Sequence, residues 1–315
     1  QLDLPRDDQL YTARAALLSR ADLVTAMVME HAGLHGAMGR VYARASGEPE
    51  MVAVAIGEHY LPRSVSDPIP STAPGRIVAL ADKLDTLAAC FLVGLIPTGS
   101  EDPYALRREA QGVVRILAEG HYRLSLRQLL SDALTLVDVT QAQPVTETLA
   151  ALESFLRGRL ENFLAGQSIT PALVRAVMSV SAEVPADTLR RAQTVQAHLN
   201  DPAFAIIVRI AGRLTNITRD VAGDDLREEL LTKPAERELL ARYLEVAPRA
   251  EFYAGRGEFD ELFNLLAELA PAIDRFYNEI LVMTEDPDLR QARLTLLKRL
   301  AELFRLLADL SLLSG

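Results

Sequence analysis

The sequence predicts an all-α protein, and three features of the chain support this prediction. Apolar residues recur at spacings of three and four from end to end, which is the pattern of amphipathic helices. Alternating apolar and polar runs bounded by turn residues, which would indicate β-strands, are scarce. The pair Asp-Pro stands at three predicted helix starts, 102–103, 201–202 and 286–287. Aspartate caps a helix N-terminus, and proline fits its first position.

The first half of the chain divides into predicted helices at its glycines and prolines. Gly33 and Gly36 interrupt the first apolar pattern, and residues 62–74 contain four prolines, which cannot continue a helix. An apolar helix carrying Asp82 and Asp85 follows that loop. The predicted helices are 11–30, one ending near 44, one ending near 59, the one around 82–85, one opened by 102–103, and 124–139.

Longer helices are predicted in the second half. Their ranges are 145–164, 171–181, 185–199, 202–221, 233–246, 259–283 and 287–312. Pro271 is a candidate break in the sixth of them. Residues 140–144 form a short polar joint, which we take as a domain boundary. The sequence therefore predicts two helical domains, 1–140 and 141–315, the second beginning with a helical linker.

The composition limits the kinds of partner the chain can have. At 315 residues it is long enough for two domains or more. A net charge of −10 excludes nucleic-acid binding through a general positive field, so RNA binding would need local basic patches. Only Lys83, Lys233 and Lys298 are lysines, and the other basic residues are arginines. This preference suits phosphate and base contacts, and a GC-rich genome would produce it as well.

Cysteine usage and the chain's ends indicate the compartment. The one cysteine, Cys90, lies in an apolar helix, which excludes disulfides within the chain and fits a reducing cytoplasm. No secretory signal is visible, and no apolar run approaches the roughly 20 residues that cross a bilayer. We expect a cytoplasmic protein with no membrane partner. Because the chain starts at Gln1 and soon enters a helix, we also expect a C-terminal part of something longer.

Residues 58–117 carry a resemblance to a known family. HYLPR at 59–63, ALADKLDTL at 79–87 and IPTGSEDPYALRR at 96–108 follow one another in this order. The ordered set resembles the β subunit of the bacterial two-subunit glycyl-tRNA synthetases. Motifs in a consistent context are more specific than any one of them alone.

The first domain also resembles the HD fold over residues 15–89. Metal-dependent phosphohydrolases of that fold hold a metal with a histidine, an adjacent His-Asp pair and a later aspartate. The resemblance places the later aspartate at Asp82 and the pair at Ala21-Asp22, where the histidine is missing. His59 is a further candidate ligand, but Asp22, His59 and Asp82 alone make an incomplete metal site. The resemblance therefore implies an HD-like scaffold without catalysis.

Three polar residues share one face of a predicted helix in the second domain. Arg209, Arg213 and Asn216 are spaced by four and three, a pattern that alone is more typical of a solvated helix face than of a binding site. Residues 276–297, FYNEILVMTEDPDLRQARLTLL, favour the binding interpretation. They resemble the DALR anticodon-binding helical bundle of arginyl-type and β-glycyl synthetases, with Tyr277 where phenylalanine is expected.

The resemblance implies the tRNA-binding β chain of a glycyl-tRNA synthetase. Such a chain binds and selects glycine tRNA through anticodon and arm contacts, so that a separate α chain can catalyse ATP-dependent glycylation. The implied partners are glycine tRNA and the α chain, in a heterotetramer, with no DNA. ATP and Mg²⁺ would serve the intact enzyme through the α chain, and neither a cofactor nor a catalytic residue is expected in this part. The candidate tRNA-binding residues are Arg209, Arg213, Asn216, Asn278, Arg293, Arg107, Arg108 and Arg115.

Two alternatives stay open on the sequence alone. A metal-dependent HD-type phosphohydrolase with a regulatory helical tail would contain metal and lose hydrolysis on Asp82→Ala. A helical adaptor that only bridges protein chains would bind no tRNA.

Overall fold

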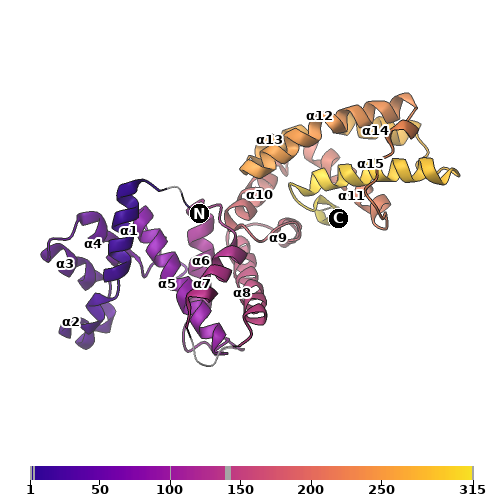
Figure 1. Ribbon diagram of the computed structural model, residues 1–315. Helices are drawn as coiled ribbons and strands as arrows, with labels where there is room; N and C mark the ends of the chain where they lie inside the picture. Colours follow the sequence, from indigo (N-terminus) through magenta and orange to yellow (C-terminus); the bar gives the residue numbers. More distant parts are fainter. Residues whose placement is uncertain (1, 3, 100, 139–142, 314–315) are drawn as a thin grey trace. The chain divides into compact units, whose positions relative to one another are not determined.

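The computed structural model describes residues 2, 4–99, 101–138 and 143–313, and all regular secondary structure in these ranges is helical (Figure 1). An isolated antiparallel bridge joins Thr98 to Glu101. The all-α prediction is therefore confirmed. None of the helices in the described ranges combines the length and the apolar content that crossing a bilayer requires.

Contacts within the chain divide it into two compact units. The first unit comprises Gln1–Phe163 and Glu183–Ala186, and the second comprises Leu164–Ala182 and Asp187–Gly315. The domain boundary predicted at residues 140–141 lies outside the described residues and stays a prediction.

The first unit is a cluster of short helices around α5, a helix of 20 residues. α3 packs on α4, α1 packs on α4 and α5, and α5 packs on α6 and α7. Alanine, valine and isoleucine side chains make the core between α1, α3, α4 and α5. The helices are α1 (Arg6–Leu18), α2 (Ala26–Glu30), α3 (Ala37–Ala45), α4 (Glu50–Glu58), α5 (Ala73–Leu92), α6 (Leu106–Glu119) and α7 (Leu126–Leu136), with 3-10 turns at Ala21–Val24 and Ala32–Leu34.

The single helix predicted over 11–30 is wrong. The chain forms α1, a 3-10 turn and α2 in its place. The reason is Asp22, which is 2% exposed and accepts hydrogen bonds from the backbone N–H groups of Gly36 (2.6 Å) and Gly39 (3.1 Å). A buried carboxylate needs such donors. Asp22 therefore ties the turn after α1 to the start of α3.

Glu58 fixes the start of α5. Its carboxylate accepts hydrogen bonds from the backbone N–H and the hydroxyl of both Ser71 and Thr72, and Thr72 also caps α5 by accepting from the N–H of Gly75. Partial burial raises the pKa of Glu58, but the hydrogen bonds from Ser71 and Thr72 outweigh it and the pKa is lowered. An added Cβ at Gly75 would lie 2.8 Å from the Thr72 hydroxyl and closer still to Glu58. This close packing sets the position of α5, which carries Asp82 and Lys83.

The second unit packs α11 against α15, and α12 against α13, α14 and α15. Phe263, Phe276 and Phe304 are among its largest buried side chains. Its helices are α9 (Pro171–Met178), α11 (Pro202–Thr218), α12 (Pro234–Arg256), α13 (Phe259–Ala267), α14 (Ala270–Glu279) and α15 (Pro287–Arg305), while α8 (Val145–Gly166) and α10 (Pro185–His198) contain residues of both units. The helix predicted over 259–283 divides before Ala270, so that Pro271 lies in the first turn of α14.

Two of the three Asp-Pro starts are confirmed. Asp201 accepts from the N–H of Ala203 at 2.8 Å, and Asp286 accepts from two N–H groups at the start of α15. Asp102 acts differently, because α6 begins only at Leu106 and the Asp102 carboxylate reaches forward to the N–H groups of Leu106 and Arg107. The prediction of a helix opening at Pro103 is therefore wrong by three residues, although Asp102 still supplies the cap.

Candidate functional site

Arg209 and Arg213 lie on the exposed face of α11 and share one carboxylate on α14. Arg209 donates to Asp274 at 3.0 Å, and Arg213 lies 3.9 Å from the same carboxylate. The Arg213 guanidinium also stands over the ring of Tyr277, 3.8 Å from its centre. An arginine above an aromatic face is held by cation–π attraction. The spacing of four predicted that the arginines share a face, but it did not reveal Asp274 or Tyr277 opposite them.

The Tyr277 ring lies beneath the Arg213 guanidinium. The same ring packs edge-on against buried Phe276, and burial raises the pKa of Tyr277 to about 12, with Arg213 acting in the opposite direction. The phenol is therefore neutral at physiological pH. Its hydroxyl is buried and has no hydrogen-bond partner in the described part of the chain.

The same face continues into a shallow cavity of about 590 Å³ on the second unit. Asn216 lies on its border, exposed, and accepts a hydrogen bond from Arg219 at 3.2 Å. Asn278 is exposed on α14, four residues after Asp274 and hence on the same side of that helix. The structure thus brings three predicted residues, Arg209, Arg213 and Asn216, to one cavity, and helical spacing places Asn278 on the side of α14 that carries Asp274. The residues lining the cavity are Phe204, Ala205, Val208, Arg209, Gly212, Arg213, Asn216 and Leu313.

Arg293 lies elsewhere. It is 2% exposed and pairs with Glu236, which is fully buried, at 2.5 Å. Arg293 also donates to the carbonyl of Leu281 at 2.8 Å, while Glu236 accepts from the N–H of Lys233 at the start of α12. This burial removes Arg293 from any surface that RNA could contact. The sequence pattern could not show it, because the partner carboxylate is 57 residues away.

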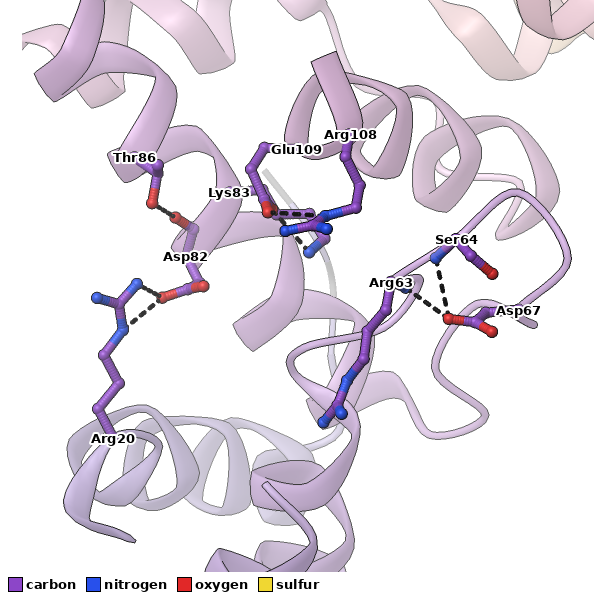
Figure 2. Close-up of polar contacts among 9 residues, drawn as sticks. All are labelled: Arg20, Arg63, Ser64, Asp67, Asp82, Lys83, Thr86, Arg108 and Glu109. Carbon is purple, nitrogen blue, oxygen red and sulfur yellow. Dashed lines mark hydrogen bonds and ion pairs between the residues drawn. The ribbon is translucent and has the colours of Figure 1, made fainter. Parts of the chain in front are cut away.

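The first unit holds a cavity of about 410 Å³ between α5, α6 and the turn after α4. Arg20 donates through Nε and Nη2 to Asp82 of α5, and Lys83 donates to Glu109 of α6 at 3.0 Å (Figure 2). Arg20, Arg63 and Lys83 were not among the predicted contact residues. Arg20 stands directly before the Ala21-Asp22 pair, and Lys83 stands directly after Asp82. Their positions beside these motif residues were the sequence signal that could have identified them.

Of the three α6 arginines predicted to contact tRNA, only Arg108 lines this cavity. The Arg108 side chain is 55% exposed, with Glu109 at 3.8 Å. Arg107 donates to the carbonyls of Gly99 and Glu101, and so holds the preceding loop. Arg115 is 9% exposed, pairs with Glu119 at 2.7 Å, and donates to the carbonyls of Ser64 and Val65. Arg115 is therefore assigned to holding the loop between α4 and α5, and not to RNA.

The metal ligands that the HD resemblance suggested do not fit a metal. Asp82 is bound by Arg20, and Asp22 is bound by backbone N–H groups. His59 is fully buried, its Nδ1 bonds the Ile56 carbonyl at 2.7 Å, and burial lowers its pKa. No group of three or more His, Cys, Asp or Glu side chains in the described ranges is arranged to hold a metal ion. We therefore derive no metal-dependent step, and the phosphohydrolase alternative is not supported.

Comparison with known proteins adds a family to this geometry. Residues 4–179 match the family model described as glycyl-tRNA synthetase beta subunit, and residues 205–311 match the DALR anticodon binding domain. Proteins named glycine–tRNA ligase beta subunit share 38% identity in Nitratidesulfovibrio vulgaris (strain Hildenborough), 38% in Citrifermentans bemidjiense and 39% in Ralstonia nicotianae. These alignments cover 96%, 96% and 97% of this chain but 45%, 44% and 44% of the relatives, so the chain spans less than half of their length.

Proposed function

This chain belongs to the glycyl-tRNA synthetase beta subunit family, and from that premise we propose that it is the tRNA-binding part of the β chain of a glycine–tRNA ligase. In this proposal it binds and selects glycine tRNA in the cytoplasm, and a separate α chain catalyses ATP-dependent glycylation. ATP and Mg²⁺ serve the intact enzyme through that α chain. We assign no catalytic step to the residues described above.

The observation that carries the proposal is the exposed face of α11 and α14. It presents two guanidinium groups, one of them stacked over the half-buried Tyr277 ring, and two exposed asparagines within the region matched by the anticodon-binding family. Unstacked RNA bases are read by stacking on aromatic or guanidinium planes and by hydrogen bonds to their edges. Arg209, Arg213, Asn216 and Asn278 have the chemistry for both, and we propose them as anticodon-contacting residues.

The positive charge that favours RNA on this face is confined to Arg209 and Arg213. Asp274 accepts from Arg209 and lies near Arg213, so one carboxylate orients two guanidinium groups and neutralises part of their charge. An arginine has five N–H donors, and a single carboxylate leaves several of them available to phosphate or base edges. We propose that Asp274 orients the two arginines before tRNA binds.

The test compares two equally exposed arginines of the second unit in the full-length β chain assembled with its α chain. The Arg213 and Arg242 side chains are 42% and 43% exposed, and Arg242 pairs only with its helix neighbour Glu245 in the contacts described. We expect Arg213→Ala to weaken glycine tRNA binding about tenfold, the scale of one stacking contact. Arg242→Ala should leave affinity within about twofold, because an exposed pair contributes little.

Anticodon substitution supplies the second arm of this test. With wild-type protein, replacing the anticodon of glycine tRNA should weaken binding. With the Arg213→Ala variant, the same replacement should weaken binding by a smaller factor. Fluorescence anisotropy at fixed salt measures both, since affinity depends strongly on ionic strength. Equal effects of Arg213→Ala and Arg242→Ala, or wild-type binding that ignores the anticodon, would contradict the proposal.

A further inference from the structure

The cavity of the first unit carries an excess of positive charge. Four cationic side chains line it, Arg20, Arg63, Lys83 and Arg108, against two carboxylates, Asp82 and Glu109. The three arginines that line it come from three segments, namely the turn after α1, the loop after α4, and α6 (Figure 2). The lining thus holds two more cations than carboxylates, which favours an anion at the cavity wall. The carboxylates of Asp22, Asp67 and Asp85 act on Tyr60, Arg63 and Arg20 from outside the lining.

The arginines are held in place while keeping donors available. Asp82 accepts from two of the five N–H donors of Arg20, whereas Lys83 is 2% exposed and is held by Glu109 at 3.0 Å. Arg63 donates to the carbonyl of His35 at 2.9 Å, and its guanidinium stands over the ring of Tyr60. Preorganised donors bind an anion with little ordering cost.

Polar atoms without partners gather beside the same cavity. The Tyr60 hydroxyl and the Arg63 Nε belong to residues that line it. Each is buried and has no hydrogen-bond partner in the described ranges. Both atoms are donors, and leaving a buried donor unpaired is unfavourable, so a ligand that offers acceptor oxygens gains at this wall.

The form of the Tyr60 hydroxyl fits that role. Burial raises the pKa of Tyr60, and the nearby Asp22 carboxylate raises it further, against the opposing effect of Arg20. The phenol therefore keeps its proton and can donate. His35 meets the ring edge-on at 4.4 Å between centres and His59 packs at 3.8 Å, so the ring is fixed.

We propose that this cavity binds the phosphate group of a nucleotide without any metal. Arg20, Arg63 and Arg108 supply the groups that contact the phosphate, the buried Lys83 adds charge from its pair with Glu109, and Tyr60 supplies a neutral donor. The volume of about 410 Å³ exceeds what a phosphate alone needs, and Leu23 and the Tyr60 ring offer apolar contact to the remainder of the ligand. The nucleotide is either free or part of an RNA strand. This site is separate from the α11 face, and it extends beyond the function proposed above.

The experiment uses the full-length β chain without the α chain, so that no ATP site of the α chain contributes. Adenosine 5′-monophosphate, inorganic phosphate and a trinucleotide RNA are titrated by calorimetry, with and without EDTA. We expect saturable binding of the monophosphate that EDTA leaves unchanged. Arg108→Ala and Tyr60→Phe should each weaken it about tenfold, the scale of a hydrogen bond to a charged group. Arg127→Ala, whose side chain is 64% exposed on α7 and paired with Glu153, is the matched control and should have no effect.

The outcomes separate the sources of the phosphate. Displacement of the monophosphate by the trinucleotide, lost in Arg108→Ala, assigns the site to RNA, and binding that the trinucleotide does not displace assigns it to a free nucleotide. Arg108→Lys should recover part of the affinity, and the melting temperature of each variant excludes misfolding. No saturable binding of any probe, binding that requires a metal, or equal affinity in Arg108→Ala and Arg127→Ala would overturn the proposal. None of these results depends on anticodon recognition by Arg213.

Discussion

The two units present their accessible arginines in different settings. In the first unit, Arg20, Arg63 and Arg108 converge with Lys83 on a concave site. In the second, Arg209 and Arg213 come from a single helix and stand side by side over Asp274 and Tyr277, at the wall of a shallow, open cavity. A concave cluster can surround one compact anion with several donors, whereas a helix face meets an extended partner one contact at a time. We therefore assign different ligands to the two arginine groups.

Burial separates a third kind of arginine from both. Arg115 and Arg293 occur in the same sequence patterns as the accessible arginines, yet they are 9% and 2% exposed and hold loops and helices through paired carboxylates. A guanidinium desolvated in this way contributes to the fold and is unavailable to a ligand. Arg20 and Arg209 are also paired with carboxylates, but their side chains are 54% and 53% exposed, so burial, and not the surrounding motif, decides which role a paired arginine has.

The largest expected effect tests the buried arginines. Arg293→Ala leaves Glu236 buried without its counter-charge, and we expect the second unit to lose about 3–5 kcal/mol of unfolding free energy. Hydrogen exchange of α12 and α15 amides measures the loss in that unit alone. Arg242→Ala, which breaks an exposed pair, should cost less than about 1 kcal/mol.

Replacing both partners sharpens the same point. Arg293→Met combined with Glu236→Leu removes both charges, and part of the lost stability should return, although the cap on the N–H of Lys233 stays lost. A loss below about 1 kcal/mol in Arg293→Ala would place this residue with the surface arginines and contradict the division drawn here.

A smaller effect is expected at Gly36, beside the concave site. Its φ is +77°, and an added Cβ would lie 2.7 Å from the Tyr60 ring and 3.2 Å from Arg63. We expect Gly36→Ala to destabilise the first unit by about 1–3 kcal/mol, through backbone strain and displacement of Tyr60. At Gly33, an added Cβ meets no described atom within 4 Å, so Gly33→Ala is the control. Equal melting temperatures of the two variants would show that the wall around Tyr60 is not rigid.

The fold was predictable where the determinants are local. Helix class, most helix ranges and the caps at Asp201 and Asp286 depend on neighbouring residues, and these predictions held. The failures depend on distant partners. The helix over 11–30 breaks because Asp22 bonds Gly36 and Gly39, and Arg293 is buried because Glu236 lies opposite it. Spacing in one sequence does not report such pairs, so the candidate site was predicted only in its exposed members.

Two half-buried tyrosines, one in each unit, allow the units to be compared through their hydroxyl groups. The hydroxyls of Tyr60 and Tyr277 are both buried without a hydrogen-bond partner in the described ranges. Removing an unpaired buried hydroxyl relieves its desolvation cost, so Tyr60→Phe and Tyr277→Phe should each leave stability unchanged or raise it by up to about 1 kcal/mol. Adding the monophosphate should stabilise wild-type and Tyr277→Phe proteins against heat, and Tyr60→Phe less. Equal stabilisation of all three proteins by the monophosphate would show that the Tyr60 hydroxyl does not contact the ligand.

The smallest effect concerns an exposed ion-pair cluster outside both sites, which sets the baseline for surface arginines. Glu50 accepts hydrogen bonds from Arg44 and from Arg40 (3.2 Å), and the bond from Arg44 in particular lowers the pKa of Glu50 to about 2 from an ordinary 4.5. A carboxyl whose pKa is lowered on folding adds stability above its unfolded pKa, and this stability is lost as the pH falls through the folded value. The difference in melting temperature between wild type and Glu50→Gln should therefore be constant above about pH 5 and shrink toward pH 2. It should also shrink in 1 M salt, since exposed charges are screened within about 3 Å there. A carboxyl titration of Glu50 near 4.5 by NMR would show that these arginines leave the carboxylate free, and that even well-aligned surface arginines of this chain bind their partners only weakly.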